Sequence, residues 1–228
     1  LRYVKNTRTM MIDGYNNNKY KTITRISEDF TRGISIYLQK RFKVNPVPSN
    51  AFTKLWEIYY QFNLVPNKKT IKMFHLAEAP GQFIKATEYY ISKKCPRNEK
   101  YLWKANSLNP FNKKVTDRFG TALFRDDYGL IKKHRQNWIW GEDDTGDITS
   151  SDNVRWYREY IHKWAEKDKV DVVTGDGGLE ITASTTDLQR LDYAQFLLAA
   201  ATNSIGGSCI IKTFTPFLGS KPETRKAS

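Results

Sequence analysis

The sequence predicts an α/β domain with a mostly parallel sheet and helices on both of its faces. After about residue 70, short β-prone runs alternate with segments of helical length, and strands separated by helices favour parallel pairing. A second observation is residues 71–83, where a short apolar run ends at Ala79-Pro80-Gly81 and leads at once into a helical segment. Such a turn brings a helix N-terminus to the carboxyl end of a strand, where open α/β sheets bind ligands.

Each element is predicted from its pattern of apolar residues and chain breakers. We expect strands at residues 71–77, 100–105, 136–140, 169–175 and 207–214. We expect helices at about 27–41, 50–62, 82–94, 152–167 and 184–203. Ser49 is a good N-cap for the second helix. The last helix has an apolar face made by Leu188, Leu191, Ala194, Leu197 and Leu198.

The chain divides by composition into three parts. Residues 1–46 form a polar, basic arm and a helical extension, residues 47–217 form the α/β domain, and residues 218–228 form a polar tail. Because the chain starts at Leu1 rather than Met, we expect it to be a fragment of a longer protein.

The charge of the chain favours a polyanionic partner such as a nucleic acid. The formal net charge is +13, although a protein that is merely basic is the alternative. Basic and aromatic residues mix in the aperiodic interval 107–135, a composition that suits contact with phosphates and bases. A solvated charged insertion fits this interval equally well. The candidate RNA contacts are Lys113, Lys114, Arg118, Lys132, Lys133 and Arg135.

The cysteines argue against a disulfide framework or a metal site. Only Cys95 and Cys209 occur, far apart and in no ligand pattern. We therefore expect an intracellular, reducing compartment, either cytoplasm or nucleus, or the host cytoplasm or virion for a viral protein. The sequence shows no signal peptide and no apolar run long enough to cross a bilayer.

Two charged residues stand at equivalent places on consecutive predicted strands. Asp176 ends the apolar run 170–175 and is flanked by glycines, while Lys212 follows three apolar residues in the run 206–214. A lysine at the end of a central strand is unfavourable unless it is paired or functional. Parallel strands end at the same edge of a sheet, so we expect Asp176 and Lys212 to meet.

Four motifs then resemble the FtsJ-like ribose 2′-O-methyltransferases, especially the cap-modifying branch of eukaryotes and large DNA viruses. The run "SNAFTKLWEI" looks like the helix with the first catalytic lysine, here Lys54, and "AEAPGQF" is similar to the cofactor loop. "DVVTGDGG" matches the strand with the catalytic aspartate, here Asp176, and "GGSCIIKTFTPF" the strand with the central lysine, here Lys212. The order and spacing of the four motifs over residues 49–217 make the resemblance specific.

The resemblance implies a Rossmann-like domain that uses S-adenosylmethionine to methylate RNA ribose, with capped mRNA as the expected partner. Lys212 would contact the 2′-hydroxyl, Lys54 would supply a like charge that favours the neutral amine, and Asp176 would orient Lys212. Methyl transfer would be one in-line displacement, with no metal. The implied cofactor contacts are Ala77, Glu78, Ala79, Pro80, Gly81, Gln82, Phe83, Asn106, Asp147, Ile148 and Asp176. Asp147, the candidate for the adenine amino group, has the alternative of building a turn before the next helix.

The chain also departs from the family pattern. Gln82 replaces a common second glycine, and His75 replaces a common acidic residue. The family's fourth catalytic residue, a glutamate, and the last strands of its sheet have no clear counterpart before Ser228, and Glu223 lies in a polar setting that does not favour the role. The chain is therefore expected to be truncated or degenerate.

Two other functions are compatible with an α/β domain of this kind. The main alternative is a catalytically inactive, RNA-binding or partner-supporting module, against which the presence of Lys54, Asp176 and Lys212 argues. A nicotinamide-dependent dehydrogenase would need Gly-x-Gly-x-x-Gly after the first strand, and the chain lacks it. Ribosomal or transfer RNA remains an alternative substrate, and the sequence predicts neither protein partners nor an oligomeric state.

Overall fold

The computed structural model describes residues 29–43, 49–120, 126–166, 169–178 and 185–213. The chain forms two compact units, Leu1–Thr53 and Lys54–Ser228. The first contains helix α3 (Asp29–Phe42) and the first turn of α4 (Asn50–Phe62). Ser49 caps α4 as predicted, since its Oγ accepts a hydrogen bond from the Phe52 amide at 3.3 Å. The predicted arm before residue 29 and the tail after residue 213 lie outside the described residues, and so do the expectations for Glu223 and for later strands.

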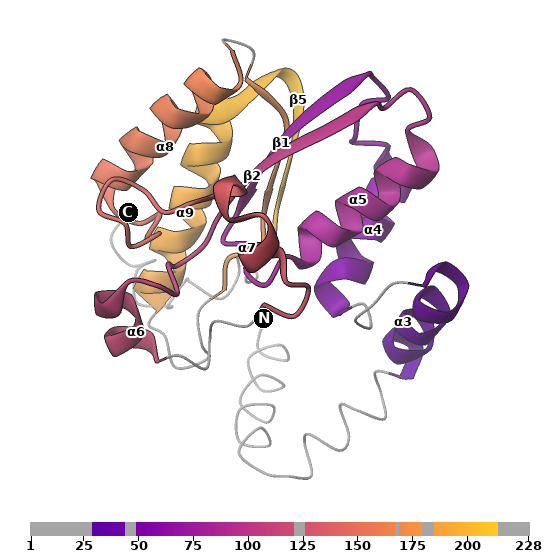
Figure 1. Ribbon diagram of the computed structural model, residues 1–228, viewed down its shortest axis with the longest axis horizontal. Coiled ribbons are helices and arrows are strands. Elements are labelled where there is room, and N and C mark those ends of the chain that lie inside the picture. The colour runs from indigo at the N-terminus through magenta and orange to yellow at the C-terminus, as the bar shows by residue number, and fades with distance from the viewer. Residues whose placement is uncertain (1–28, 44–48, 121–125, 167–168, 179–184, 214–228) are drawn as a thin grey trace, which may run out of the picture. The chain divides into compact units, whose positions relative to one another are not determined.

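The second unit is built on a five-stranded, wholly parallel sheet, which confirms the predicted α/β class (Figure 1). The strand order is β3-β2-β1-β4-β5, so β1 lies at the centre. The strands are β1 (Thr70–Leu76), β2 (Lys100–Asn106), β3 (Trp138–Ile139), β4 (Val170–Gly175) and β5 (Asn203–Ile211).

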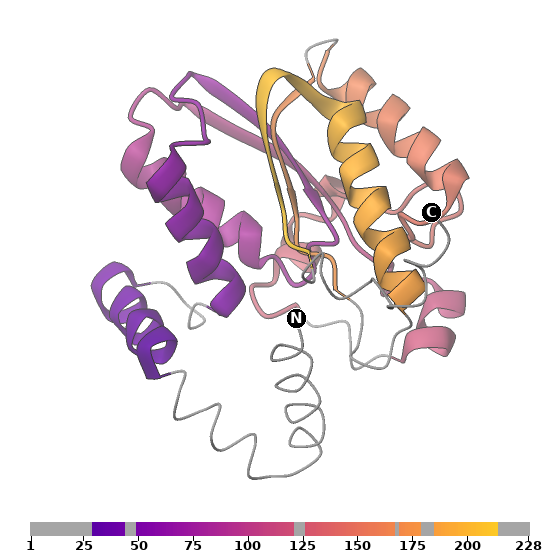
Figure 2. The same cartoon turned by 180° about the vertical axis from the view of Figure 1, so that it is seen from behind.

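Helices cover both faces of this sheet, as Figures 1 and 2 show from opposite sides. On one face, α8 (Ser151–Trp164) and α9 (Thr185–Thr202) pack against the sheet. The buried core between them includes Phe74, Leu76, Tyr157, Ile161, Leu191 and Leu198. On the other face lie α5 (Gln82–Lys94) and the second-unit part of α4, where Tyr59 and Tyr90 pack with ring centroids 5.2 Å apart. None of the described helices is long and apolar enough to cross a membrane.

A buried histidine links the three central strands. The His75 ring bonds the Thr174 hydroxyl through Nδ1 and the Tyr101 hydroxyl through Nε2, both at 2.7 Å. These partners lie on β4 and β2, on either side of β1. Burial lowers the pKa of His75 to about 3, so the ring is neutral at physiological pH. The residue that departs from the family pattern therefore ties the sheet together.

Several predicted boundaries differ from the structure. Helix α9 ends at Thr202 and β5 begins at Asn203 with no loop between them, so the strand starts four residues earlier than predicted. The strand continues through Gly206, which has φ +79° and interrupts the register between β4 and β5. Leu197, assigned to the buried face of α9, is 57% exposed. The predicted strand 136–140 shortens to the two residues of β3.

The interval 107–135 contains short helices rather than one long loop. They are α6 (Lys113–Phe119), α7 (Leu130–Lys133) and the 3-10 turn η2 (Arg135–Asn137). Asn112 caps α6 by accepting a hydrogen bond from the Lys114 amide at 3.0 Å. Of these elements, α7 lies beside the loop that follows β1, because Leu130 approaches Gly81, and Figure 1 shows α7 in front of the strands.

Candidate active site

The loop after β1 leads from the central strand into α5. Ala77 and Gly81 have positive φ values of 50° and 106°, a backbone region that favours glycine. A Cβ on Gly81 would lie 2.3 Å from Leu130 Cδ1. Glycine is thus required at position 81 both by the backbone and by the close approach of α7.

Glu78 occupies the N-terminus of α5 with its own carboxylate. The side chain is 3% exposed, and its Oε1 accepts hydrogen bonds from the amides of Phe83 at 2.7 Å and Ile84 at 3.1 Å. These two amides are therefore already hydrogen-bonded within the protein, a feature that the sequence did not indicate. Oε2 has no hydrogen-bond partner among the described residues. Burial raises the pKa of Glu78 well above its usual value, against the lowering effect of the Ile84 amide.

Asp176 and Lys212 meet at the ends of β4 and β5. The Lys212 ammonium lies 2.5 Å from Asp176 Oδ1 and 3.3 Å from the Asp176 carbonyl oxygen. The Asp176 side chain is 20% exposed and that of Lys212 is 40% exposed. The Asp176 amide donates to the Leu76 carbonyl at 3.2 Å, so the pair lies beside the end of β1. This is the meeting that the sequence suggested.

Gln195 on α9 fixes the backbone around Asp176. Its Oε1 accepts a hydrogen bond from the Gly177 amide at 2.9 Å, and its side chain is fully buried. A Cβ on Gly175 would lie 2.5 Å from Gln195 Oε1, and one on Gly177 would lie 2.7 Å from it. The glycines beside Asp176 therefore make room for Gln195, a positioning residue that no motif pointed to.

Lys54 has no contact with this pair among the described residues. It is an exposed residue of α4, and within the described part of the chain its ammonium has neither a hydrogen bond nor an ion pair. Its expected place beside Lys212 therefore stays a prediction that rests on its motif.

The loop after β3 is held by a dense set of hydrogen bonds. Asp147 Oδ1 accepts hydrogen bonds from both the amide and the hydroxyl of Thr149, at 2.8 and 2.7 Å. One of its two carboxylate oxygens therefore stabilises a turn, which was the alternative to a contact with adenine. Asn106, which is 1% exposed, donates to the Gly146 carbonyl at 3.0 Å and to the Tyr157 hydroxyl at 2.5 Å. Its amide thus joins the loop to the core, and its expected contact with the cofactor stays a prediction.

The segment before β3 contacts the loop after β1. The Tyr128 hydroxyl donates to Gln82 Oε1 at 2.6 Å, and burial raises the pKa of Tyr128 to about 12. The glutamine that departs from the family pattern is therefore anchored by Tyr128. This contact joins residues 46 positions apart in sequence.

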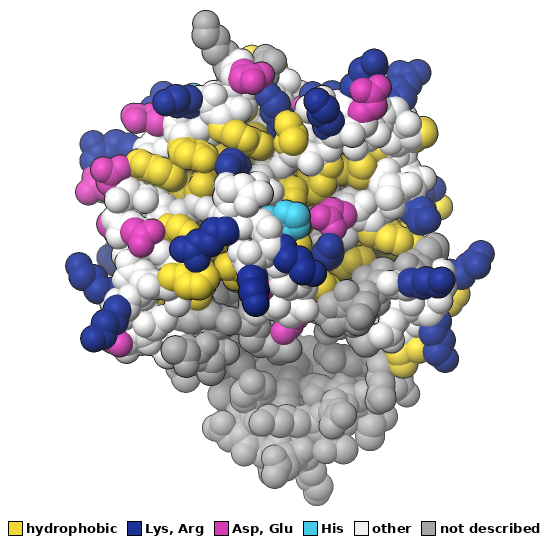
Figure 3. Space-filling model, in the orientation of Figure 1, with side chains coloured by type: hydrophobic (Ala, Val, Ile, Leu, Met, Phe, Trp, Pro, Cys, Tyr) yellow, Lys and Arg dark blue, Asp and Glu magenta, His cyan; other side chains and the backbone are white. Residues whose placement is uncertain are grey.

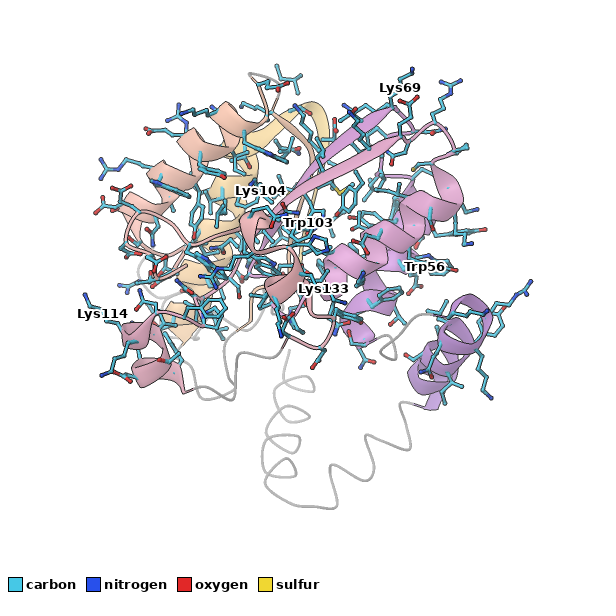
Figure 4. All side chains as sticks on the ribbon, viewed as in Figure 1. Trp56, Lys69, Trp103, Lys104, Lys114 and Lys133 are labelled. Carbon is cyan, nitrogen blue, oxygen red and sulfur yellow. The ribbon has the colours of Figure 1, made fainter. Side chains whose placement is uncertain are left out.

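The six predicted RNA contacts are exposed but do not gather in one place. Three lie on α6, two on α7 and one in η2: Lys113, Lys114, Arg118, Lys132, Lys133 and Arg135. Figure 4 shows Lys114 and Lys133 well separated. In the space-filling view, Lys and Arg side chains alternate with hydrophobic ones over this face (Figure 3). Within the described residues, no group of three or more His, Cys, Asp or Glu side chains could hold a metal ion.

Comparison with known proteins identifies the family. Residues 47–224 match the model of the FtsJ-like methyltransferases. The chain belongs to the FtsJ-like methyltransferase family. An uncharacterized protein of Acanthamoeba polyphaga mimivirus is 31% identical over 90% of this chain and 26% of its own length. The cap-specific mRNA (nucleoside-2′-O-)-methyltransferase 2 of Drosophila melanogaster is 31% identical over 73% of this chain and 24% of its own. That of Pongo abelii is 30% identical over 74% and 22%. The chain thus spans about a quarter of the length of these relatives.

FtsJ-like methyltransferases are generally dependent on S-adenosylmethionine, and the residues of this FtsJ-like domain fit that group. The loop 77–83 leaves the central strand beside Asp176, whose amide donates to the Leu76 carbonyl. The second carboxylate oxygen of Asp147 has no hydrogen-bond partner within the described residues. S-adenosylmethionine is an amino acid joined to a nucleoside. A backbone turn at the centre of the sheet suits its amino-acid part, and a carboxylate oxygen beside that turn suits its nucleoside.

Proposed function

We propose that this chain is the catalytic domain of an S-adenosylmethionine-dependent RNA ribose 2′-O-methyltransferase that acts on capped mRNA. The observation that carries the proposal is the contact of Lys212 with Asp176 at 2.5 Å, beside the loop that leaves β1. Lysine, aspartate and a glycine-containing turn thus meet at the carboxyl edge of one parallel sheet, where ligands of such sheets bind.

In the proposed mechanism, Lys212 in its neutral amine form accepts the proton of the ribose 2′-hydroxyl. A 2′-hydroxyl is a poor nucleophile, so a base that takes its proton while the new C–O bond forms lowers the barrier. When bound, S-adenosylmethionine would supply an electrophilic methyl group, whose bond to sulfur breaks as the C–O bond forms, with S-adenosylhomocysteine as the leaving group. Asp176 fixes the direction of the Lys212 side chain through its Oδ1 and its carbonyl oxygen, and Gln195 fixes Asp176 in turn.

The cofactor would lie across the ends of β1, β2 and β3. The backbone of residues 77–83 would hold the methionine end, and the free oxygen of Asp147 would accept from the adenine amino group. Glu78 already saturates the first amides of α5, so the cofactor carboxylate would find other partners. Lys54, the second lysine of the proposal, would supply a like charge that favours the neutral amine of Lys212.

The test is transfer of labelled methyl from S-adenosylmethionine to matched capped and uncapped RNAs, followed by nuclease mapping. Label on a 2′-oxygen beside the cap is the expected result. Label on internal riboses would replace capped mRNA by another RNA substrate. If no RNA is labelled although the chain binds RNA, the catalytically inactive RNA-binding module is the better reading.

The Lys212→Ala variant tests the role of the lysine in the same assay. We expect transfer to fall by about 10²- to 10⁴-fold, the contribution of a positioned acid–base group, while affinity for S-adenosylhomocysteine changes little. Lys69→Ala is the matched control, because Lys69 is an exposed lysine that immediately precedes β1, at the opposite end of the strands (Figure 4). Equal loss of transfer and of cofactor affinity in Lys212→Ala would contradict the assigned role.

A further inference from the structure

An exposed aromatic side chain lies near the carboxyl edge of the sheet outside the residues discussed so far. Phe111 follows β2 and is 58% exposed. The loop that carries it is fixed: the buried Asn109 accepts a hydrogen bond from the Phe111 amide at 3.0 Å and donates to the Asp144 carbonyl at 2.8 Å. The ring is thus presented to solvent by a well-bonded loop.

Arg135 and Trp140 both pack against this ring, and we call these three side chains the Phe111 platform. The Arg135 guanidinium carbon lies 3.8 Å from the centroid of the Phe111 ring. The Trp140 ring meets Phe111 edge to face at 6.4 Å, and Trp138 stacks behind Trp140 at 6.0 Å with an interplanar angle of 14°. Successive contacts between rings hold the platform in place.

The chemistry of the platform fits a nucleobase better than a phosphate. A guanidinium plane and an aromatic ring are the surfaces on which unpaired bases stack. In the described part of the chain the Arg135 guanidinium has no hydrogen-bond or ion-pair partner, so its donors remain available to a base edge. The exposed carboxylates of Glu142, Asp143 and Asp144 follow Trp140 closely in sequence, which weakens any pure attraction for phosphate.

The position of the platform suits a base near the methylated nucleotide. Phe111 and Trp140 follow β2 and β3, whereas Asp176 and Lys212 follow β4 and β5. Strands lie about 4.8 Å apart, so two to four strand intervals separate the two places along the carboxyl edge. We propose that the Phe111 platform stacks a nucleobase of the RNA substrate, a role that rests on the proposed function and adds a base-stacking site to it.

The test measures binding of the 228-residue chain to short unstructured RNA, capped and uncapped, by fluorescence anisotropy. In Phe111→Ala, RNA affinity should fall by about 5- to 150-fold, the usual effect of removing one stacking ring. Phe111→Trp should restore binding. Arg135→Lys, which keeps the charge but loses the plane, should weaken it. Tyr193→Ala is the control, because Tyr193 is 75% exposed on α9, and its RNA affinity should match the wild type.

Two further measurements separate the sources of the stacked base. Affinity for S-adenosylhomocysteine should be unchanged in Phe111→Ala; a comparable loss there would mean that the platform stacks the cofactor adenine, and would overturn the proposal. An RNA with one abasic position at the contact should bind the wild type more weakly but Phe111→Ala no worse than intact RNA. Equal RNA affinity of Phe111→Ala and wild type, or no RNA binding by the wild type, would also overturn it. Wild type that binds RNA through Phe111 but transfers no methyl would contradict the proposed function alone.

Discussion

At the scale of single residues, buried polar side chains hold the candidate site in shape. Glu78 accepts two amides of α5, and Gln195 accepts one amide beside Asp176. Both side chains are buried, so their hydrogen bonds offset part of the free energy lost on removing them from water. Glu78 differs from Gln195 because it carries a charge that burial makes unfavourable.

The buried carboxyl group of Glu78 makes the stability of the domain depend on pH. The raised pKa of Glu78 means that the folded protein binds its proton at pH values where the unfolded chain has released it. Glu78 therefore makes stability fall as pH rises above the ordinary carboxyl range. Glu78→Gln keeps an acceptor for the Phe83 and Ile84 amides without the charge, so its Tm should exceed the wild type by more at pH 8 than at pH 5.

Thermal unfolding at the two pH values measures this difference. A domain of this size shifts its Tm by about 2–4 °C for each kcal/mol. Glu88→Gln serves as control, since Glu88 pairs with Lys85 on the surface of α5 at 2.7 Å. A Glu78→Gln variant that is less stable by the same amount at both pH values would show that the carboxylate is stabilising.

At the scale of elements, local sequence patterns placed most helices well but misplaced the last strand. Helices α4 and α5 have the boundaries expected from their caps and periodicity. The start of β5 was put after Gly206-Gly207 because paired glycines usually mark a turn. In the structure the strand begins before them, at Asn203, and the two glycines lie where the pairing with β4 shifts register, between Asn203 and Ser208.

In the candidate site, too, some contacts could be predicted from the sequence and others could not. Asp176 and Lys212 could be expected to meet because both follow neighbouring parallel strands. The contacts of Gln195 with Gly177 and of Tyr128 with Gln82 join residues 18 and 46 positions apart. Such pairs depend on how helices pack on the sheet, which periodicity alone does not specify.

Gly177→Ala tests the contact between α9 and the loop that carries Asp176. The added Cβ would lie 2.7 Å from the buried Gln195 Oε1, so either Gln195 or the loop must move. We expect a loss of about 1–3 kcal/mol in the free energy of unfolding, measured by urea denaturation, together with slower methyl transfer. Gly33→Ala, where a Cβ meets nothing within 4 Å, should not be destabilised. Unchanged stability of Gly177→Ala would argue that Gln195 is free to turn away.

At the scale of the whole molecule, the net charge of +13 favours binding to a polyanion such as RNA. The exposed lysines occur on several elements, so position decides which of them meet RNA. Lys132 and Lys133 on α7 adjoin the cofactor loop through Leu130 and Gly81. Lys93 and Lys94 end α5, at the far end of that helix from the loop.

Salt dependence of RNA binding separates these two pairs. Each lysine that neutralises a phosphate of single-stranded RNA contributes about 0.7 to the slope of log affinity against log salt. The Lys132→Ala/Lys133→Ala variant should therefore lower the slope by up to about 1.4, whereas Lys93→Ala/Lys94→Ala should leave it unchanged. Equal effects of the two double variants would indicate binding by overall charge without a preferred path.

The regular pairing of β5 with β4 after Gly206 restricts how this protein can change in length during evolution. Gln195 on α9 holds the Asp176 loop, and β5 carries Lys212, so both members of the ion pair depend on one continuous piece of chain. One residue inserted between Ser208 and Lys212 would turn Lys212 to the opposite face of the sheet, whereas the irregular pairing around Gly206 would absorb one inserted before it. Insertions and deletions should therefore accumulate in the interval 107–135 and be excluded from residues 208–212.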